Sequence, residues 1–336
     1  MRPMHSREGW TNPLRRPMMR VSLAMPPLQA HCSTPRTASR SRESGQVVVL
    51  LLAFLVVLLG MAAFAIDVGS WYRADRALQS SVDAAALAAA QALPDDPGGA
   101  GALAAEYGDK NGGGLETVTV TGAVVADDTV VVTGKRDAPG FFSKVFGIDS
   151  VEVHARAAAR AGTLEEARWA APFGVDEQHP MLQCEPTPCF EQDTQLDLDK
   201  IGPGAFRIIN IDGSHGGTGP GILADWIMRG YEGYMPLGWY YSDPGAKFNS
   251  SQVKSALDAR LGSEMLFPIY RDTRGGGSNF EYEIVGWAGY VITSYDIQGS
   301  KNNKLNGYFK RVVWEGIGSE SAGSPSFGAR AVSLVE

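Results

Sequence analysis

Two cysteines carry the clearest chemistry that the sequence offers. Cys184 and Cys189 enclose the residues Glu-Pro-Thr-Pro, and a disulfide between them would close a small loop stiffened by two prolines. Such a bond is expected outside the cytoplasm, where cysteines are oxidised. Two free thiols are the alternative, because the spacing suits either state. A zinc site would need further Cys or His residues at ligand spacing, which the sequence does not provide.

Residues for catalysis are otherwise sparse. The chain has five histidines, and it contains no Gly-x-Ser-x-Gly nucleophile elbow, no Walker A loop and no His-Glu-x-x-His zinc motif. No nucleophile can be paired with a base. The sequence therefore predicts a protein that is not an enzyme and that holds no cofactor.

Charge is distributed unevenly along the 336 residues. Residues 1–44 hold eight arginines and two glutamates, a net charge of +6, although the whole chain carries −7. The remainder is therefore strongly acidic. An acidic body does not suit nucleic-acid binding, which needs clustered positive charge against phosphates. We expect no nucleic-acid partner.

The element that must position everything else is an uncharged run at residues 47–66, which reads VVVLLLAFLVVLLGMAAFAI. As an α-helix at about 1.5 Å per residue, this run would span roughly 30 Å, the thickness of a bilayer's hydrocarbon layer. A buried helix of a soluble protein would keep a polar stripe, which this run lacks. A cleaved signal peptide is the stronger alternative, but the run exceeds an h-region of about 7–15 residues. We expect a retained membrane anchor.

The flanks of this run predict its orientation. Arginines dominate residues 1–44, whereas Asp67, Asp75 and Asp83 outnumber the two arginines in the segment that follows. By the positive-inside rule, residues 1–44 form a basic, disordered cytoplasmic tail, and everything after Asp67 lies outside the cell. The prediction is a single-pass protein of the cell membrane, with the lipid bilayer as its first partner.

Beyond Asp67 the sequence is rich in alanine, leucine and glutamine as far as Pro94, which favours a continued helix. Small side chains in such a helix let a partner approach closely. A narrow stripe at three- and four-residue steps contains these alanines together with larger apolar residues: Trp71, Leu78, Val82, Ala85, Ala89 and Leu93. The stripe either packs on the protein's own folded part or joins subunits in a homo- or hetero-oligomer, and the first alternative is favoured.

Several features of this segment occur in one order: Gly45 before the apolar run, Asp67 and Gly69 at its exit, then Leu78 and Gln79, then Asp83, Ala84, Ala85 and Leu87 in an alanine-rich block. The segment, about residues 44–93, resembles the N-terminal part of TadE/TadG-like Flp pilus-assembly proteins. The resemblance implies a structural or accessory protein of a Tad (tight adherence) pilus or secretion apparatus on a bacterial cell. It also implies pilus or apparatus proteins as partners.

Two departures from the family pattern matter. Gly45 is followed five positions later by Leu50, where precursors cut by a prepilin peptidase carry Glu, so we expect a permanent anchor. Larger TadG proteins carry a metal motif, Asp-x-Ser-x-Ser. Its nearest counterpart here contains Asp212 and Ser214 but has Gly216 in place of the last hydroxyl. The glycine-rich surroundings favour a turn. We therefore expect no metal site, with Asp212 and Ser214 as the candidates if one exists.

The predicted fold class is α+β. It combines a transmembrane and stalk helix, a small pilin-like β-rich unit, and a C-terminal α+β domain outside the membrane with an antiparallel sheet. The expected divisions are residues 1–44 (tail), 45–93 (helix and stalk), 94–115 (linker), 116–160 (β-rich unit), 161–172 (linker) and 173–336 (C-terminal domain).

Local patterns predict elements within these divisions, beginning with a short helix around residues 102–107. Two β-branched runs joined by Ala126-Asp127-Asp128 favour a hairpin. Asp137, followed two residues later by proline, predicts the cap of a short helix at residues 140–146. Ser250 and its neighbours predict the cap of another helix, which ends near Leu261. Further strands are expected at residues 265–270, 280–295, 308–317 and 329–335, the second of them central in a sheet.

The sequence thus favours a single-pass membrane protein that helps to assemble or anchor a pilus through protein contacts. A membrane-tethered domain that binds a ligand, a cell-wall polymer or a divalent metal is the alternative. It would use Asp212 and Ser214, or a group of aromatic residues: Trp226, Tyr231, Tyr234, Trp239, Tyr240 and Tyr241. Core packing accounts equally well for these aromatic residues.

Overall fold

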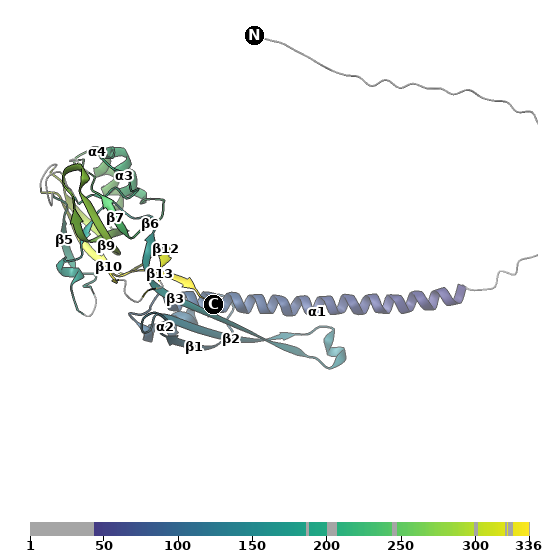
Figure 1. Ribbon diagram of the computed structural model, residues 1–336. Coiled ribbons are helices and arrows are strands. Elements are labelled where there is room, and N and C mark those ends of the chain that lie inside the picture. The colour runs from purple at the N-terminus through teal and green to yellow at the C-terminus, as the bar shows by residue number, and fades with distance from the viewer. Residues whose placement is uncertain are drawn as a thin grey trace, which may run out of the picture. The chain divides into compact units, whose positions relative to one another are not determined.

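The computed structural model describes residues 44–185, 188–199, 207–243, 247–298, 302–319, 321 and 325–335 (Figure 1). The basic tail expected at residues 1–44 thus lies outside the described residues, except for Ser44. Two units are distinguished, Met1–Val56 and Val57–Glu336. Both sheets and all the contacts discussed below lie in the second.

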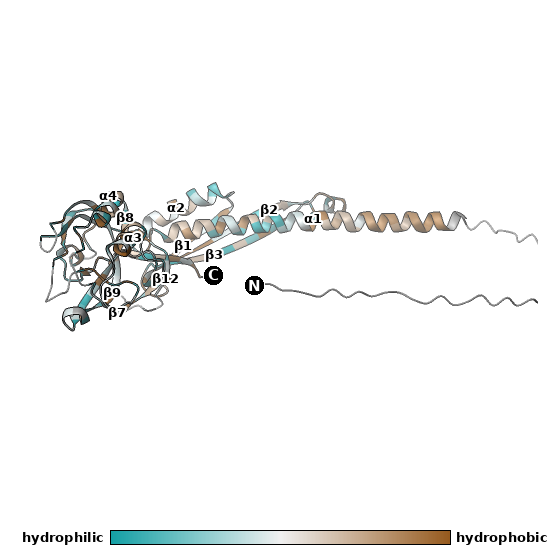
Figure 2. Cartoon of the chain, turned by 90° about the horizontal axis from the view of Figure 1, so that it is seen from above, coloured by the Kyte–Doolittle hydropathy of each residue, from teal (hydrophilic) through white to brown (hydrophobic). Residues whose placement is uncertain are grey.

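The first element is a helix, α1 (Ser44–Ala90), which contains no proline and takes in both the apolar run and the alanine-rich stretch. Its residues 47–66 carry no charged side chain, and Figure 2 shows them in brown, the hydrophobic end of the colour scale. Among the described residues this is the one helix that is long and apolar enough to cross a membrane. The helix is consistent with the single membrane span expected from the sequence.

A seven-stranded sheet packs against the second half of α1. Its members are β1 (Leu115–Thr121), β2 (Thr129–Pro139), β3 (Ser150–Ala167), β6 (Met235–Pro236), β11 (Val312–Val313), β12 (Gly316–Gly318) and β13 (Ala329–Leu334). The order is β1–β2–β3–β13–β11, and β6 and β12 also pair with β3. β2 and β3 form a long antiparallel hairpin in which Pro139 lies opposite Ser150.

Small side chains allow α1 to lie close to this sheet. The buried interface consists largely of alanines from the helix and from β3: Ala85, Ala86, Ala89, Ala90, Ala155, Ala157, Ala159 and Ala161. Leu78 and Val82 of the helix lie over β2, where Gly134 leaves room for them. The alanine stripe of the helix is therefore covered by the protein's own sheet, which is the first of the two alternatives above.

A second helix, α2 (Pro97–Lys110), occupies most of the linker expected at residues 94–115. Asp96 caps it, because its side chain accepts a backbone hydrogen bond from the first turn. Its glycines suggested a linker, since each glycine costs a helix about 1 kcal/mol relative to alanine. Burial of Ala100 and Ala104 in the same cluster as α1 offsets that cost, so the short helix expected around residues 102–107 is longer and runs from Pro97 to Lys110.

The strand β3 also continues into residues expected to be a linker, 161–172, as far as Ala167. Its second half pairs with β12 and β13, which come from the C-terminal end of the chain. The sequence suggested a linker here because it does not show which distant strands are available to pair with this stretch. The sheet beside α1 is therefore built from both ends of the folded part.

A six-stranded sheet and two helices make up the remaining core. They are β4 (Val175–Asp176), β5 (Asp193–Asp197), β7 (Gly238–Tyr241), β8 (Glu264–Arg274), β9 (Glu281–Asp296), β10 (Lys304–Lys310), α3 (Pro220–Arg229) and α4 (Ser251–Arg260). The order β4–β8–β9–β10–β5 places β9 at the centre, as predicted, and the pair β4–β8 is parallel. One face packs on α3 and α4 (Figure 1), and the other packs toward β3 and β13.

Short 3₁₀ turns complete the described fold: η1 (Ser143–Phe146), η2 (Pro180–Leu182) and η3 (Gly277–Asn279). The first replaces the helix expected at residues 140–146. β2 continues to Pro139, and Asp137, the expected cap, lies opposite Glu152 in the strand pair. The strand is therefore longer than expected and is followed by a 3₁₀ turn. The first N–H groups of this turn are bound by a residue of α1 and not by Asp137.

Replacing Gly134 with Ala should destabilise the contact between α1 and the sheet. An added Cβ would lie 2.7 Å from the carbonyl oxygen of Gly114 and 2.8 Å from a methyl carbon of Val82. We expect the free energy of unfolding of the full chain in detergent to fall by about 1–3 kcal/mol. Denaturant titration followed by tryptophan fluorescence measures this change.

Gly101→Ala is the matched control, since an added Cβ there meets nothing within 4 Å and Gly101 lies inside α2. Its stability should rise slightly, because alanine favours a helix more than glycine does. Equal effects of the two substitutions would contradict the close packing of helix and sheet.

Candidate functional site

The residues that carry the family resemblance all lie on α1, with Gly45 in its first turn. Leu78 and Ala85 are fully buried against the sheet. Four further side chains are partly buried beside them: Gln79, Asp83, Ala84 and Leu87. An added Cβ at Gly69 would meet nothing within 4 Å, so contacts with the described residues do not explain this glycine.

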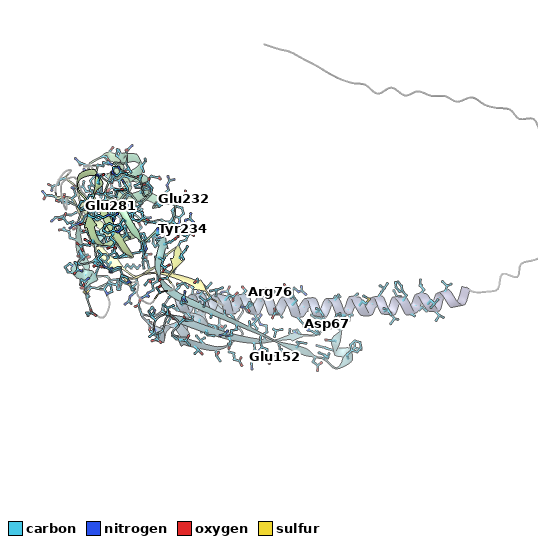
Figure 3. All side chains as sticks on the ribbon, in the orientation of Figure 1. Asp67, Arg76, Glu152, Glu232, Tyr234 and Glu281 are labelled. Atoms are coloured by element: carbon cyan, nitrogen blue, oxygen red, sulfur yellow. A yellow bond between two sulfur atoms is a disulfide. The ribbon has the colours of Figure 1, made fainter. Side chains whose placement is uncertain are left out.

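Asp67, the first residue after the apolar run, is buried although it carries a charge, with only 2% of its surface exposed. Its carboxylate accepts hydrogen bonds from three consecutive backbone N–H groups in the turn between β2 and β3. The donors are Phe141 at 2.9 Å, Phe142 at 3.0 Å and Ser143 at 2.5 Å. Figure 3 shows Asp67 on α1 beside this turn. We call this contact the Asp67 clasp.

The clasp provides hydrogen-bond partners both for the backbone N–H groups of the turn and for the buried carboxylate of Asp67. The N–H groups at the start of a helical turn have no carbonyl partner within that turn, so they need an acceptor from outside. A carboxylate removed from water needs donors in return, and hydrogen bonds to a charged acceptor are stronger than those between neutral groups. The clasp therefore holds the β2–β3 turn against α1 at the point where the apolar run ends.

A second carboxylate closes the loop between β1 and β2, at the other end of β2. Asp128 is 1% exposed and accepts hydrogen bonds from the N–H groups of Ala123, Val124 and Val125 and from the hydroxyl of Thr129. Burial alone would raise the pKa of Asp128, but these hydrogen bonds outweigh it and hold the pKa below its usual value. Asp128 belongs to the loop that it closes, whereas Asp67 reaches its loop from the helix.

Two further contacts fix α1 and its end to the sheet. The side-chain amide of Gln79 donates a hydrogen bond to the carbonyl oxygen of Arg156 in β3 at 3.0 Å. Asp95, just beyond the helix, forms ion pairs with Arg311 at 3.3 Å and with Arg330 at 3.4 Å. The chain therefore contacts the sheet where the apolar run ends, along the second half of α1 and beyond its last turn.

The sequence does not identify the partners of Asp67, because every residue except proline has a backbone N–H group. The one sequence feature that distinguishes the partner segment is its composition. Residues 141–148 read FFSKVFGI, which is strongly apolar for a turn between two strands.

Asp212 and Ser214, the metal candidates, lie in an exposed turn. The carboxylate of Asp212 accepts a hydrogen bond from the N–H of Ser214 at 2.9 Å, and the side-chain amide of Asn210 donates to the carbonyl oxygens of Ser214 and Gly216. Such bonds are typical of a turn that closes on itself. Throughout the part of the chain that the structure describes, no group of three or more His, Cys, Asp or Glu side chains is placed to hold a metal ion.

The aromatic residues of β7 are divided between the two faces of their strand. Tyr240 is buried in the core, whereas its neighbours Trp239 and Tyr241 are only partly buried, as expected for alternate positions of a strand. The guanidinium of Arg274 lies 4.1 Å from the ring centre of Trp239, and the ring of His215 lies 4.6 Å from that of Tyr241. Core packing and these pairings account for the strand's three aromatic side chains.

Cys184 and Cys189 form a disulfide, with their Cα atoms 5.6 Å apart. The loop that it closes follows η2, and the N–H of Cys189 donates a hydrogen bond to the carbonyl oxygen of Met181 at 2.8 Å. A disulfide in this loop is the state expected of a domain outside the cytoplasm.

Residues 45–92 match the protein-family model Tad, described as Flp pilus-assembly TadE/G-like. The resemblance inferred from the sequence is thereby confirmed for the segment that forms α1. No curated protein and no solved structure matches the chain. The family match thus covers the apolar run, Asp67 and the alanine-rich face that packs on the sheet.

Proposed function

We propose that this chain, whose residues 45–92 are a TadE/G-like segment, is a structural or accessory component of a Tad (Flp) pilus-assembly or secretion apparatus. It acts through contacts with pilus or apparatus proteins and with the lipid bilayer, and it is not an enzyme. The observation that carries the proposal is the place of the family segment in the fold. The segment contains the apolar run and also Asp67, Gln79 and the alanines that attach α1 to the β2–β3 hairpin.

The polar side chains of this segment support a mechanical role. Asp67 accepts hydrogen bonds from three backbone N–H groups. The side-chain amide of Gln79 donates hydrogen bonds to the carboxylate of Asp83 at 2.7 Å and to a backbone carbonyl oxygen of β3. A general acid or base needs a free path to the proton of a substrate, which groups in such contacts lack. The segment therefore supplies position and attachment.

The proposed orientation places residues 1–44 in the cytoplasm and both sheets outside the membrane. The arginine-rich N-terminal flank of the apolar run favours this orientation by the positive-inside rule. The disulfide between Cys184 and Cys189 favours it independently, because such bonds persist in oxidising surroundings. The protein is then a single-pass protein of a bacterial cell membrane.

The ligand-binding alternative has no specific observation in its favour. Asp212 and Ser214 form a closed turn, and the rings of β7 are engaged with the core, with Arg274 or with His215. The other aromatic candidates are engaged as well: the ring of Trp226 lies against that of Tyr231, and the guanidinium of Arg168 lies 5.3 Å from the ring centre of Tyr234. One role is therefore proposed.

The orientation can be tested with the chain's own cysteines. In intact cells, a maleimide that cannot cross the membrane should label the protein only after treatment with a reductant that also stays outside, because the disulfide is exported and Cys32 is not. Labelling should persist in Cys32→Ser and disappear when Cys184 and Cys189 are both replaced by Ser. Labelling of Cys32 in intact cells without any reductant would contradict the orientation.

The role in assembly predicts the phenotype of a deletion. A strain of the native host that lacks this chain should show no Flp pili by electron microscopy and should lose surface adhesion. Resupplying the full chain should restore both. Unchanged piliation and adhesion in the deletion strain would refute the proposed function.

A further inference from the structure

The turn between β2 and β3 exposes a group of large apolar side chains. We call residues 140–149 the hairpin tip. Val145 and Phe146 are each 83% exposed and Phe141 is 61% exposed, and Phe142 and Ile148 are also exposed. Single exposed apolar residues are ordinary, whereas a contiguous group of this kind marks a surface that contacts something else.

The exposure is a property of an ordered turn. The N–H of Gly140 donates to the carbonyl oxygen of Asp149 at 2.9 Å, which closes the base of the tip. Within the tip, the hydroxyl of Ser143 donates to the carbonyl oxygen of Ile148 at 3.0 Å. The backbone is therefore held by its own hydrogen bonds while the apolar side chains point away from the described part of the protein.

The Asp67 clasp fixes the level at which these side chains lie. Asp67 directly follows Ile66, the last residue of the apolar run, and its carboxylate binds the N–H groups at residues 141–143. Figure 3 shows the hairpin reaching along α1 as far as Asp67. The tip thus lies where the helix leaves the hydrocarbon layer, if residues 47–66 span a bilayer.

Other residues at this level suit the surface of a membrane. Tyr72, little more than one turn beyond Asp67, is 57% exposed and follows Trp71. Tyr and Trp are enriched where membrane helices pass through the headgroup region. Lys144 is exposed within the tip, and a lysine among apolar side chains can extend its ammonium group toward anionic headgroups.

We propose that the hairpin tip inserts Phe141, Val145 and Phe146 into the interfacial layer of the same bilayer that residues 47–66 span. We assign lipid as the partner of the tip, because the bilayer crossed by residues 47–66 would end beside it. The protein then touches the membrane at two points, its helix and its hairpin tip. Two attachments fix the tilt and rotation of the folded part relative to the membrane, which one helix alone leaves free.

The inference rests on the proposed membrane span but not on the role in pilus assembly. Three exposed valines provide matched labelling sites. Val145 lies in the tip, Val125 lies in the β1–β2 loop at the other end of β2, and Val57 lies within the apolar run. Each is replaced by Cys in a Cys32→Ser background, where the disulfide leaves no other reactive thiol, and is labelled with an environment-sensitive nitrobenzoxadiazole dye.

The labelled full-length chains are reconstituted into vesicles of phosphatidylcholine and phosphatidylglycerol that carry no bromine, bromine on the acyl chains near the headgroups, or bromine near the ends of the acyl chains. We expect the Val145→Cys label to show blue-shifted emission and to lose intensity in vesicles with bromine near the headgroups. The Val57→Cys label, near the middle of the span, should be quenched by bromine near the ends of the acyl chains. The Val125→Cys label should show neither effect, because it marks the far end of the same hairpin.

The possible failures are distinguishable. If Val57→Cys is quenched while Val145→Cys behaves like Val125→Cys, the tip does not enter the bilayer and the inference is overturned, although the span stands. A blue shift at Val145→Cys without quenching by bromine would place the tip against protein and would also overturn it. If Val57→Cys is not quenched, the span itself fails, and the inference fails with it.

Discussion

The carboxylate of Asp67 accepts hydrogen bonds from the backbone N–H groups of residues that lie 74 to 76 positions farther along the chain. Much of the fold follows from making that contact possible. The β2–β3 hairpin must be long enough to run from the buried face of α1 to the end of the apolar run. Its turn must present several N–H groups in one direction, which the start of a 3₁₀ turn does. In return, the buried charge directly after the apolar run receives hydrogen bonds from the protein itself.

The rest of the helix is attached by a different kind of contact. Alanines on α1 and β3 face one another. Gly134 of β2 has no side chain, so Leu78 and Val82 of the helix can pack directly against the strand. Because the protein's own sheet covers this stripe, contacts with other subunits have to use other surfaces. The exposed large apolar side chains of α1 and of the hairpin are concentrated in residues 47–66 and in the hairpin tip. Both lie at or within the membrane in the proposed orientation.

Local signals in the sequence predicted local structure well. The apolar run and the alanine-rich stretch form one helix, as their composition indicated. Ser250 caps α4, where its side chain accepts a hydrogen bond from the N–H of Val253. β9 is central in its sheet, as expected from apolar side chains on both faces. In each case neighbouring residues contained the necessary information.

What the sequence did not reveal depends on residues far apart. The motif identified Asp67 but not its partners, because any residue other than proline offers the same N–H group. Residues 161–167 form a strand through pairing with β6, β12 and β13, all from later in the chain. α2 is longer than the short helix expected around residues 102–107, because burial of its alanines favoured the helix despite its glycines. α3 was missed, although Gly219-Pro220 is a common helix start.

The Asp67 clasp is tested most directly by amide hydrogen exchange of the full chain in lipid nanodiscs. The N–H groups of Phe141, Phe142 and Ser143 should be protected in the native protein and should lose protection in Asp67→Asn, whose side-chain amide cannot receive all of these donors. Asp75→Asn, on the same helix but outside the clasp, should leave their protection unchanged. Equal exchange in the native protein and in Asp67→Asn would contradict the account.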